Sequence, residues 1–341
     1  MQSINPNYEN KSKTVRDVAY YVEGLHAGNR FILSECITLV ESRSPSKRKI
    51  AKEILEKIKT PTSTIRIGIT GTPGVGKSTF IEAFGMYLIQ QGHRPSVLAI
   101  DPSSQSNMGS ILGDKTRMQF LSTNENAYVR PTATGNILGG TAAYTKEAIQ
   151  LCEAAGFDII IVETVGVGQS ETEVDFITDI NLLLLQPGAG DDIQGIKRGI
   201  MENADIFVIN KADGPQLQLA KQTKISYQTA IQLFHHDTDG WSCPVILASS
   251  TEKMGFDIIW KAIEDYKQLI LKSGNFYTNR TEQEVRWFSM RSSALLQQLV
   301  FNQSDVKQFF EHFADAIRHE KISGSSALTE MELIFKKIIQ N

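Results

Sequence analysis

The sequence has few cysteines, and they form no pattern. Cys36, Cys152 and Cys243 lie far apart, without a CxxC pair or an even-numbered framework. Such scattered cysteines are typical of chains from reducing compartments, so we expect buried apolar thiols rather than disulfides or a redox motif. Concentrated positive charge is missing too, because 35 Lys and Arg residues are spread along the chain against 38 Asp and Glu. Nucleic-acid backbones require a basic field, so we expect no nucleic-acid partner.

Long apolar runs are also missing. Residues 1–12 are polar and contain no apolar core of a signal peptide. No later run reaches the roughly 18 to 20 apolar residues that a membrane-spanning helix needs. We therefore expect a cytoplasmic protein without a membrane partner.

Apolar segments of strand length recur at helix-length spacing through the middle of the chain. They are residues 65–70, 96–100, 127–130, 157–162, 181–185, 206–209 and 245–248. Most are continuous rather than alternating, which is typical of parallel strands covered by helices on both faces. The sequence predicts an α/β fold with a doubly wound, mostly parallel sheet.

Helical patterns without strands flank this sheet. We expect an N-terminal helical extension over residues 1–60, the α/β domain over 61–272 and a C-terminal helical arm over 273–341. Apolar positions of the arm, such as Phe288, Leu295 and Leu299, fit two arrangements. They can cover the chain's own core or pair with a second copy.

A glycine-rich motif, GTPGVGKST, lies between the first strand and the next helix. In such a loop the backbone N–H groups converge on phosphate oxygens, Lys77 neutralises the β- and γ-phosphates, and the Ser78 hydroxyl ligates Mg²⁺. The residues predicted to bind phosphate in this way are Gly71, Pro73, Gly74, Val75, Gly76, Lys77, Ser78 and Thr79.

Two further strand ends carry candidate groups for the same phosphates. Glu163 follows the strand 157–162, where an Asp is the usual residue, and can hold Mg²⁺ through a water. The amide of Gly166 can meet the γ-phosphate, so that loss of this phosphate releases the segment behind it. Asp101 ends the strand 96–100 and is placed to approach Mg²⁺ or the attacking water.

A base-reading motif follows the strand 206–209. In Asn210-Lys211-Ala212-Asp213, the Asp213 carboxylate can accept from the ring N–H and the exocyclic amine of guanine, a pair that adenine does not offer. The Lys211 stem covers the ring and Asn210 braces the loop. Ser249, after the last strand, can complete the pocket through a backbone N–H.

Long Gly-, Ser- and Asp-rich loops over residues 101–114, 130–141 and 186–195 are candidate switches, because connections in such folds usually have about 2 to 6 residues. Asp114, in the first of these loops, and Arg117, just after it, add charge there. Many GTPases place a glutamine after the phosphate-sensing glycine to orient water, whereas Val167 follows Gly166 here. We therefore expect slow intrinsic hydrolysis, and Gln169 stays a candidate for this role.

These motifs resemble those of the MeaB/ArgK GTPases, bacterial relatives of the human methylmalonic aciduria type A protein. The stretches that carry the resemblance are residues 71–79, 101–104, 109–118, 138–140, 162–171, 186–200 and 210–213. It implies a P-loop NTPase of the SIMIBI type that binds GTP or GDP with Mg²⁺. It also implies a homodimer, joined through the C-terminal helices.

The resemblance further implies a partner, an adenosylcobalamin-dependent acyl-CoA mutase such as methylmalonyl-CoA mutase, which these GTPases assist in cofactor loading and protection. Ser78, Asp101, Asp114 and Glu163 would then surround Mg²⁺ and the γ-phosphate, with Lys77 beside them. Residues 186–200, including Asp192 and Lys197, would form a third switch toward the mutase. Residues 105–108 and 130–136 depart from the family pattern, which affects partner choice rather than nucleotide binding.

Two other functions stay open at the level of sequence. One is a kinase linked to arginine or ornithine transport, although guanine reading by Asp213 is awkward for an enzyme that uses ATP. The other is a nickel-delivery GTPase, which would need clustered His and Cys ligands, whereas the cysteines here are isolated.

Overall fold

The computed structural model describes residues 16–42, 44–101, 118–133, 142–164, 174, 176–189, 201–234, 240–301 and 303–340. They belong to two compact units. The first runs to Val285 and contains the sheet, and the second begins at Arg286 and contains the C-terminal helices. The division falls inside a single long helix.

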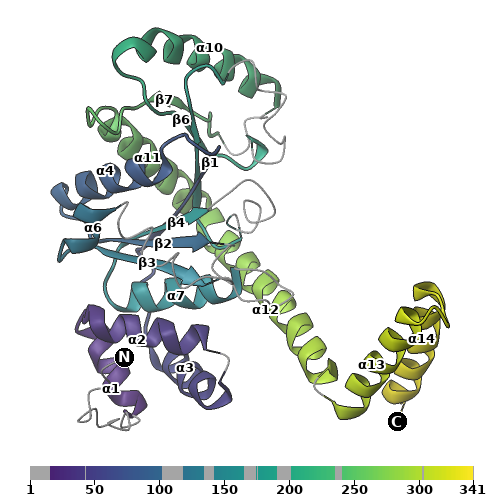
Figure 1. Ribbon diagram of the computed structural model, residues 1–341. Coiled ribbons are helices and arrows are strands. Elements are labelled where there is room, and N and C mark those ends of the chain that lie inside the picture. The colour runs from purple at the N-terminus through teal and green to yellow at the C-terminus, as the bar shows by residue number, and fades with distance from the viewer. Residues whose placement is uncertain are drawn as a thin grey trace, which may run out of the picture. The chain divides into compact units, whose positions relative to one another are not determined.

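The first unit is built on a sheet of seven parallel strands (Figure 1). The strands are β1 (Ile65–Gly71), β2 (Pro95–Asp101), β3 (Tyr128–Ala133), β4 (Ile159–Thr164), β5 (Ile180–Leu185), β6 (Ile206–Ile209) and β7 (Val245–Leu247). Their order is β3-β2-β4-β1-β5-β6-β7. In the centre, Ile67 of β1 pairs with Ile161 of β4 and Ile180 of β5. The predicted doubly wound parallel fold is confirmed.

Helices cover both faces of this sheet, which explains why its strands are continuous apolar runs. On one face, Leu182 and Leu184 of β5 belong to a core shared with α4 (Lys77–Gln90), α6 (Gln119–Thr123) and α11 (Phe256–Ser273). On the other, Leu183 and Leu185 pack with α10 (Leu217–Phe234), which follows the short 3₁₀ helix η1 (Gly214–Gln216). Helix α7 (Ala142–Ala154) packs against β2, β3 and β4.

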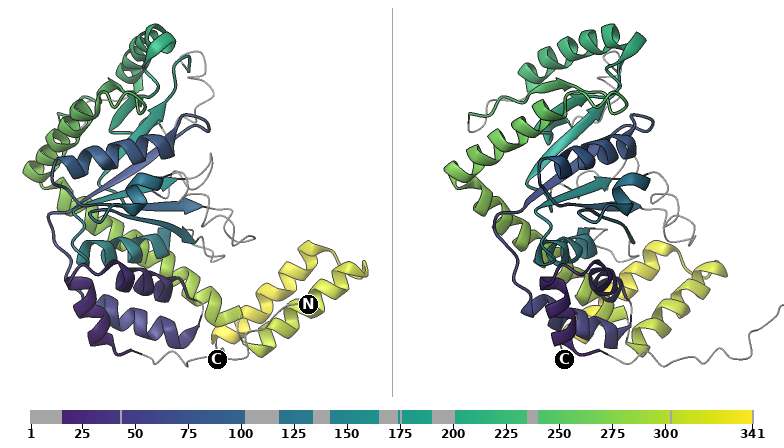
Figure 2. Two further views of the ribbon diagram at one scale, coloured as in Figure 1. Left: turned by 60° about the vertical axis from the view of Figure 1, so that its left-hand side comes forward. Right: turned by 90° about the vertical axis from the view of Figure 1, so that its left-hand side faces the viewer.

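The N-terminal extension forms three helices, α1 (Val18–His26), α2 (Arg30–Glu41) and α3 (Pro45–Lys57). They lie against α7 on the side away from the sheet (Figures 1 and 2). Asn29 caps α2 by accepting from the backbone N–H groups of Phe31 and Ile32. Arg48 of α3 binds Glu147 of α7 through bonds of 2.9 and 3.2 Å. These contacts attach the extension to the α/β domain.

The first turns of α12 (Asn275–Phe301) belong to the sheet-containing unit. Arg280 binds the Asp179 carboxylate through Nε at 2.8 Å and Nη2 at 2.7 Å, and Gln283 donates to the carbonyl of Thr178 at 2.6 Å. In the second unit, α13 (Ser304–Arg318) and α14 (Gly324–Gln340) form a helical pair whose buried side chains include Val306, Phe313 and Ala327. Among the described helices, none combines the length and apolarity required to cross a bilayer.

Candidate nucleotide-binding site

The glycine-rich loop lies at the carboxyl end of β1 and leads into α4, as the motif predicts. Gly76 adopts a φ of 87°, and a Cβ atom there would meet the Asn210 side chain at 3.1 Å. A Cβ atom on Gly71 would lie 2.6 Å from the carbonyl oxygen of Leu184. Glycine is therefore required at both positions, and the first N–H groups of α4 stay available to an anion.

Lys77, Ser78 and Glu163 meet beside this loop. Lys77 Nζ donates to the Gly71 carbonyl at 2.5 Å, and Ser78 Oγ donates to Glu163 Oε1 at 3.3 Å. Glu163 lies on β4, next to β1 in the sheet, and is only 3% exposed. A hydroxyl and a carboxylate oxygen side by side are ligands that suit Mg²⁺, so these residues fit the ion.

The rest of the predicted phosphate loop contributes backbone. Val75 is buried, whereas Pro73 and Gly74 in the loop and Thr79 in the first turn of α4 are exposed. Other predicted residues lie outside the described part of the chain, and they are Asp114, Arg117, Gly166, Gln169, Asp192 and Lys197. Asp101 is described only as the last residue of β2.

The base-reading motif follows β6 and is hydrogen-bonded to the phosphate loop. Asn210, 1% exposed, donates through Nδ2 to the Val75 carbonyl at 2.9 Å. Lys211 has a φ of 57° and donates through Nζ to the Gly74 carbonyl at 2.6 Å. The two loops, which are distant in sequence, therefore form one hydrogen-bonded structure.

Two hydroxyl groups hold the Asp213 carboxylate. Ser249 Oγ and Thr251 Oγ1 both donate to Asp213 Oδ2, the latter at 3.1 Å. The backbone N–H of Ser249 donates to the Met254 carbonyl at 3.1 Å, so in this structure Ser249 reaches Asp213 through its hydroxyl. The predicted backbone contact of this segment with a base stays a prediction. Thr251 was not predicted, because a threonine in a loop gives no signal by itself.

A buried ionic network fixes β1 near its amino end, away from the phosphate loop. Arg66 donates to Glu153 through Nε at 2.8 Å and Nη2 at 3.1 Å, and Thr64 donates to the same carboxylate at 2.8 Å. Burial opposes the charge of Arg66, but the hydrogen bonds and charge of Glu153 outweigh it and raise the pKa of the guanidinium. The network positions the strand that carries the loop.

Comparisons with known proteins identify the family of this chain. A family model described as methylmalonyl Co-A mutase-associated GTPase MeaB matches residues 33–305. The GTPase ArgK of Escherichia coli (strain K12) is 41% identical over 315 residues, which are 92% of this chain and 95% of the relative. The mitochondrial methylmalonic aciduria type A homolog of Mus musculus is 44% identical over 286 residues, 81% of this chain and 69% of the relative.

A solved structure shares the fold over almost the whole chain. The crystal structure of an LAO/AO transport system kinase is similar with a TM-score of 0.72 and 35% identity, covering 94% of this chain and 97% of that one. Together with the phosphate loop and the guanine motif, these matches show that the chain belongs to the MeaB family of GTPases and is related to the methylmalonic aciduria type A protein.

Proposed function

We propose that this chain is a Mg²⁺-dependent G protein that binds GTP, hydrolyses it slowly to GDP and phosphate, and thereby assists an adenosylcobalamin-dependent acyl-CoA mutase. The observation that carries the nucleotide part is the attachment of the base-reading motif to the phosphate loop. Asn210 binds the Val75 carbonyl and Lys211 binds the Gly74 carbonyl, so base and phosphate recognition share one structure. A ligand that has only a base or only phosphates cannot occupy the whole site.

The residues at the base end select guanine. Asp213, held by Ser249 and Thr251, presents carboxylate oxygens to the ring N–H and the exocyclic amine of the base. Adenine offers neither group in this arrangement, so its binding would leave the carboxylate without a donor from the base. This chemistry supports GTP and GDP as ligands.

The residues at the phosphate end hold and neutralise the triphosphate. Lys77 would exchange its bond to the Gly71 carbonyl for the β- and γ-phosphates, and the N-terminus of α4 would receive phosphate oxygens. Ser78 and Glu163 would hold Mg²⁺, with Asp101 and Asp114 proposed to complete the shell. When bound, the ion supplies charge neutralisation to the phosphate oxygens.

The mutase as partner rests on family membership. The matching family model is named for association with methylmalonyl-CoA mutase, and the mouse relative carries the name of methylmalonic aciduria type A. We propose cofactor loading and protection of the mutase as the task, with Gly166, Gln169, Arg117, Asp192 and Lys197 in the nucleotide-sensing switches. We further propose a cytoplasmic homodimer joined through the C-terminal helices.

Hydrolysis assays test this function. GTP turnover is measured with and without an adenosylcobalamin-dependent methylmalonyl-CoA mutase, with ATP as the control nucleotide. We expect slow GTP turnover that rises when the mutase is added and little turnover of ATP.

Equal use of ATP and GTP without a response to the mutase would contradict the proposal. Transfer of phosphate to an added substrate would instead support a kinase linked to arginine or ornithine transport; the structural relative is named a transport system kinase.

A further inference from the structure

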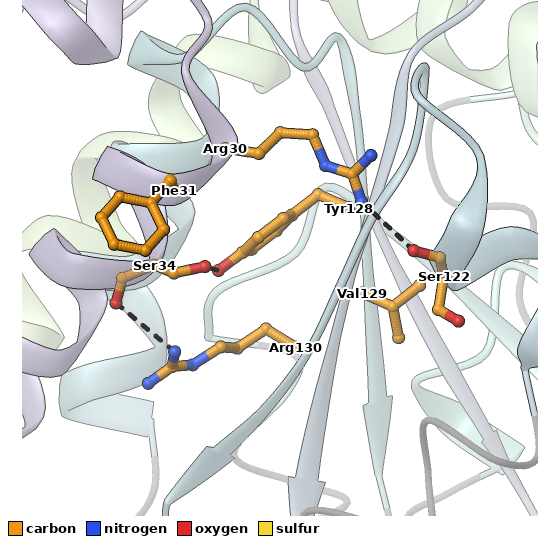
Figure 3. A pocket seen from close by; sticks show the side chains of 7 residues that line it. All are labelled: Arg30, Phe31, Ser34, Ser122, Tyr128, Val129 and Arg130. Atoms are coloured by element: carbon orange, nitrogen blue, oxygen red, sulfur yellow. Dashed lines mark hydrogen bonds between the residues drawn. The ribbon is translucent and has the colours of Figure 1, made fainter.

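A pocket separate from the nucleotide site lies between α2 and the edge strand β3. Its volume is about 240 Å³. It is lined by Arg30, Phe31, Ser34, Ser122, Tyr128, Val129 and Arg130 (Figure 3). None of the seven lining residues is acidic, and two are arginines. The pocket therefore favours a ligand with negative charge.

Arg30 supplies a positive charge that is oriented but not neutralised. Its Nη1 donates to the Asn124 carbonyl at 2.8 Å and its Nη2 to the Ser122 carbonyl at 3.2 Å. Within the described ranges, no carboxylate lies within ion-pair distance of this guanidinium. Carbonyl oxygens fix the plane of the group but carry no net charge, so Arg30 can still pair with an anion.

Arg130, in contrast, already has a carboxylate partner. Its Nη2 binds Glu41 Oε2 at 2.7 Å and Thr38 Oγ1 at 3.2 Å, and its Nη1 donates to the Ser34 carbonyl at 3.4 Å. The charges of Arg130 and Glu41 cancel, which leaves the single charge of Arg30. A ligand with one negative charge balances the pocket, whereas a phosphate dianion would leave it with excess negative charge.

The remaining walls combine one hydroxyl pair with apolar surface. In Figure 3 the Tyr128 ring lies between the two arginines, and its hydroxyl meets Ser34 Oγ at 2.9 Å. One of these hydroxyls donates to the other, so the pair retains one O–H for a further acceptor. Burial raises the pKa of Tyr128 to about 12, so its hydroxyl stays protonated at neutral pH.

Val129 and Phe31 supply the apolar part. Val129 lines the pocket from the edge of the core and is 5% exposed, while Phe31 is 65% exposed and offers an aromatic ring to a bound molecule. The volume is below the roughly 300 to 1,000 Å³ of pockets for drug-sized ligands, so only a short molecule fits.

We propose that this pocket binds a small organic monocarboxylate, with its carboxylate on Arg30 and the Ser34–Tyr128 hydroxyl pair and its short apolar body against Val129 and Phe31. The proposal concerns a second site and does not depend on the nucleotide chemistry.

Methyl NMR of Val129 tests this, because Val129 is one of the residues that line the pocket. The protein is first saturated with GDP and Mg²⁺, so that added anions cannot occupy the phosphate loop. Sodium butyrate is titrated at constant ionic strength, and butyramide, its neutral analogue of the same shape, is titrated in parallel. We expect a saturable shift of the Val129 methyl signals with butyrate and at least about tenfold weaker binding of butyramide.

Variants assign the effect to Arg30. In Arg30→Gln we expect butyrate to bind at least about tenfold more weakly, because the charged donor is lost. Arg94→Gln is the matched control, since Arg94 also donates to a main-chain carbonyl, that of Gly156 at 3.3 Å, but lies outside the pocket. Phe31→Ala should reduce the preference for butyrate over acetate, and unchanged GDP affinity confirms that each variant is folded.

Four results would overturn the proposal. They are the absence of a saturable butyrate shift, equal binding of butyramide, tighter binding of inorganic phosphate than of butyrate, and equal losses in Arg30→Gln and Arg94→Gln. The last would show a general effect of net charge.

Discussion

Replacing Asn210 with alanine removes the amide that joins the base-reading loop to the phosphate loop. Its Nδ2 donates to the Val75 carbonyl at 2.9 Å, and its Oδ1 accepts from Ser250 Oγ at 2.9 Å. Each bond contributes about 1 kcal/mol net, and both partners are buried, so the loss amounts to about 2 to 3 kcal/mol. If this free energy aligns the two loops for the ligand, GDP affinity falls roughly 30- to 150-fold in Asn210→Ala.

Titration of a fluorescent GDP analogue measures this loss, with Asn126→Ala as a control because Asn126 is exposed. Inosine diphosphate, which lacks the exocyclic amine, should lose the same factor as GDP, since Asn210 acts through alignment and not through the base. A change in GDP affinity below about threefold in a folded variant would refute the reasoning. So would a loss confined to one of the two nucleotides.

Three further changes test other parts of the structure. Arg280→Ala removes the charged partner of the Asp179 carboxylate, whose side chain is 3% exposed and which keeps the Arg66 backbone N–H as a donor. The variant should lower the free energy of unfolding by about 3 to 5 kcal/mol in urea titrations, and a loss below about 1 kcal/mol would contradict a structural role. Glu163→Gln should lower the affinity for Mg²⁺ roughly 10- to 100-fold, seen as a higher Mg²⁺ concentration for half-maximal hydrolysis. An unchanged Mg²⁺ titration would show that Glu163 is not part of the metal site. At pH 8 a thiol reagent should modify half-buried Cys243 well before Cys152, because burial raises the pKa of Cys152 to about 12. Labelling of Cys152 should accelerate as the pH rises toward this pKa. Equal labelling rates of Cys152 and Cys243 at pH 8, measured by mass spectrometry, would contradict the burial of Cys152.

The strands were predictable because burial on both faces leaves a simple signal in the sequence. Leu182 to Leu185 face two different cores in alternation, so the segment must be apolar throughout. The strand order was not predictable in the same way. Placing β1 between β4 and β5 depends on pairings such as Ile67 with Ile161, which no local pattern encodes.

The candidate site likewise has a part that the sequence predicts and a part that it does not. The motifs located Ser78 and Glu163, whose side chains meet, because the phosphate loop leads from β1 to Ser78 and Glu163 lies near the end of β4, at the same edge of the sheet. The contribution of Thr251 to Asp213 could not be predicted, since it depends on how the loop after β7 folds back. The pocket at Arg30 could likewise not be predicted from the sequence, because its walls come from three separate elements, α2, α6 and β3.

Guanine selectivity through Asp213 underlies the proposed function, and an exchange of this base-reading residue tests it. GDP, ADP and xanthosine diphosphate affinities are measured for the native chain and for Asp213→Asn. Xanthine carries a carbonyl where guanine carries its amine, so an asparagine amide can donate to it. We expect a strong preference for GDP in the native chain and a shift toward xanthosine diphosphate in the variant. Equal affinity of the native chain for GDP and ADP, or an unchanged GDP preference in Asp213→Asn, would contradict it.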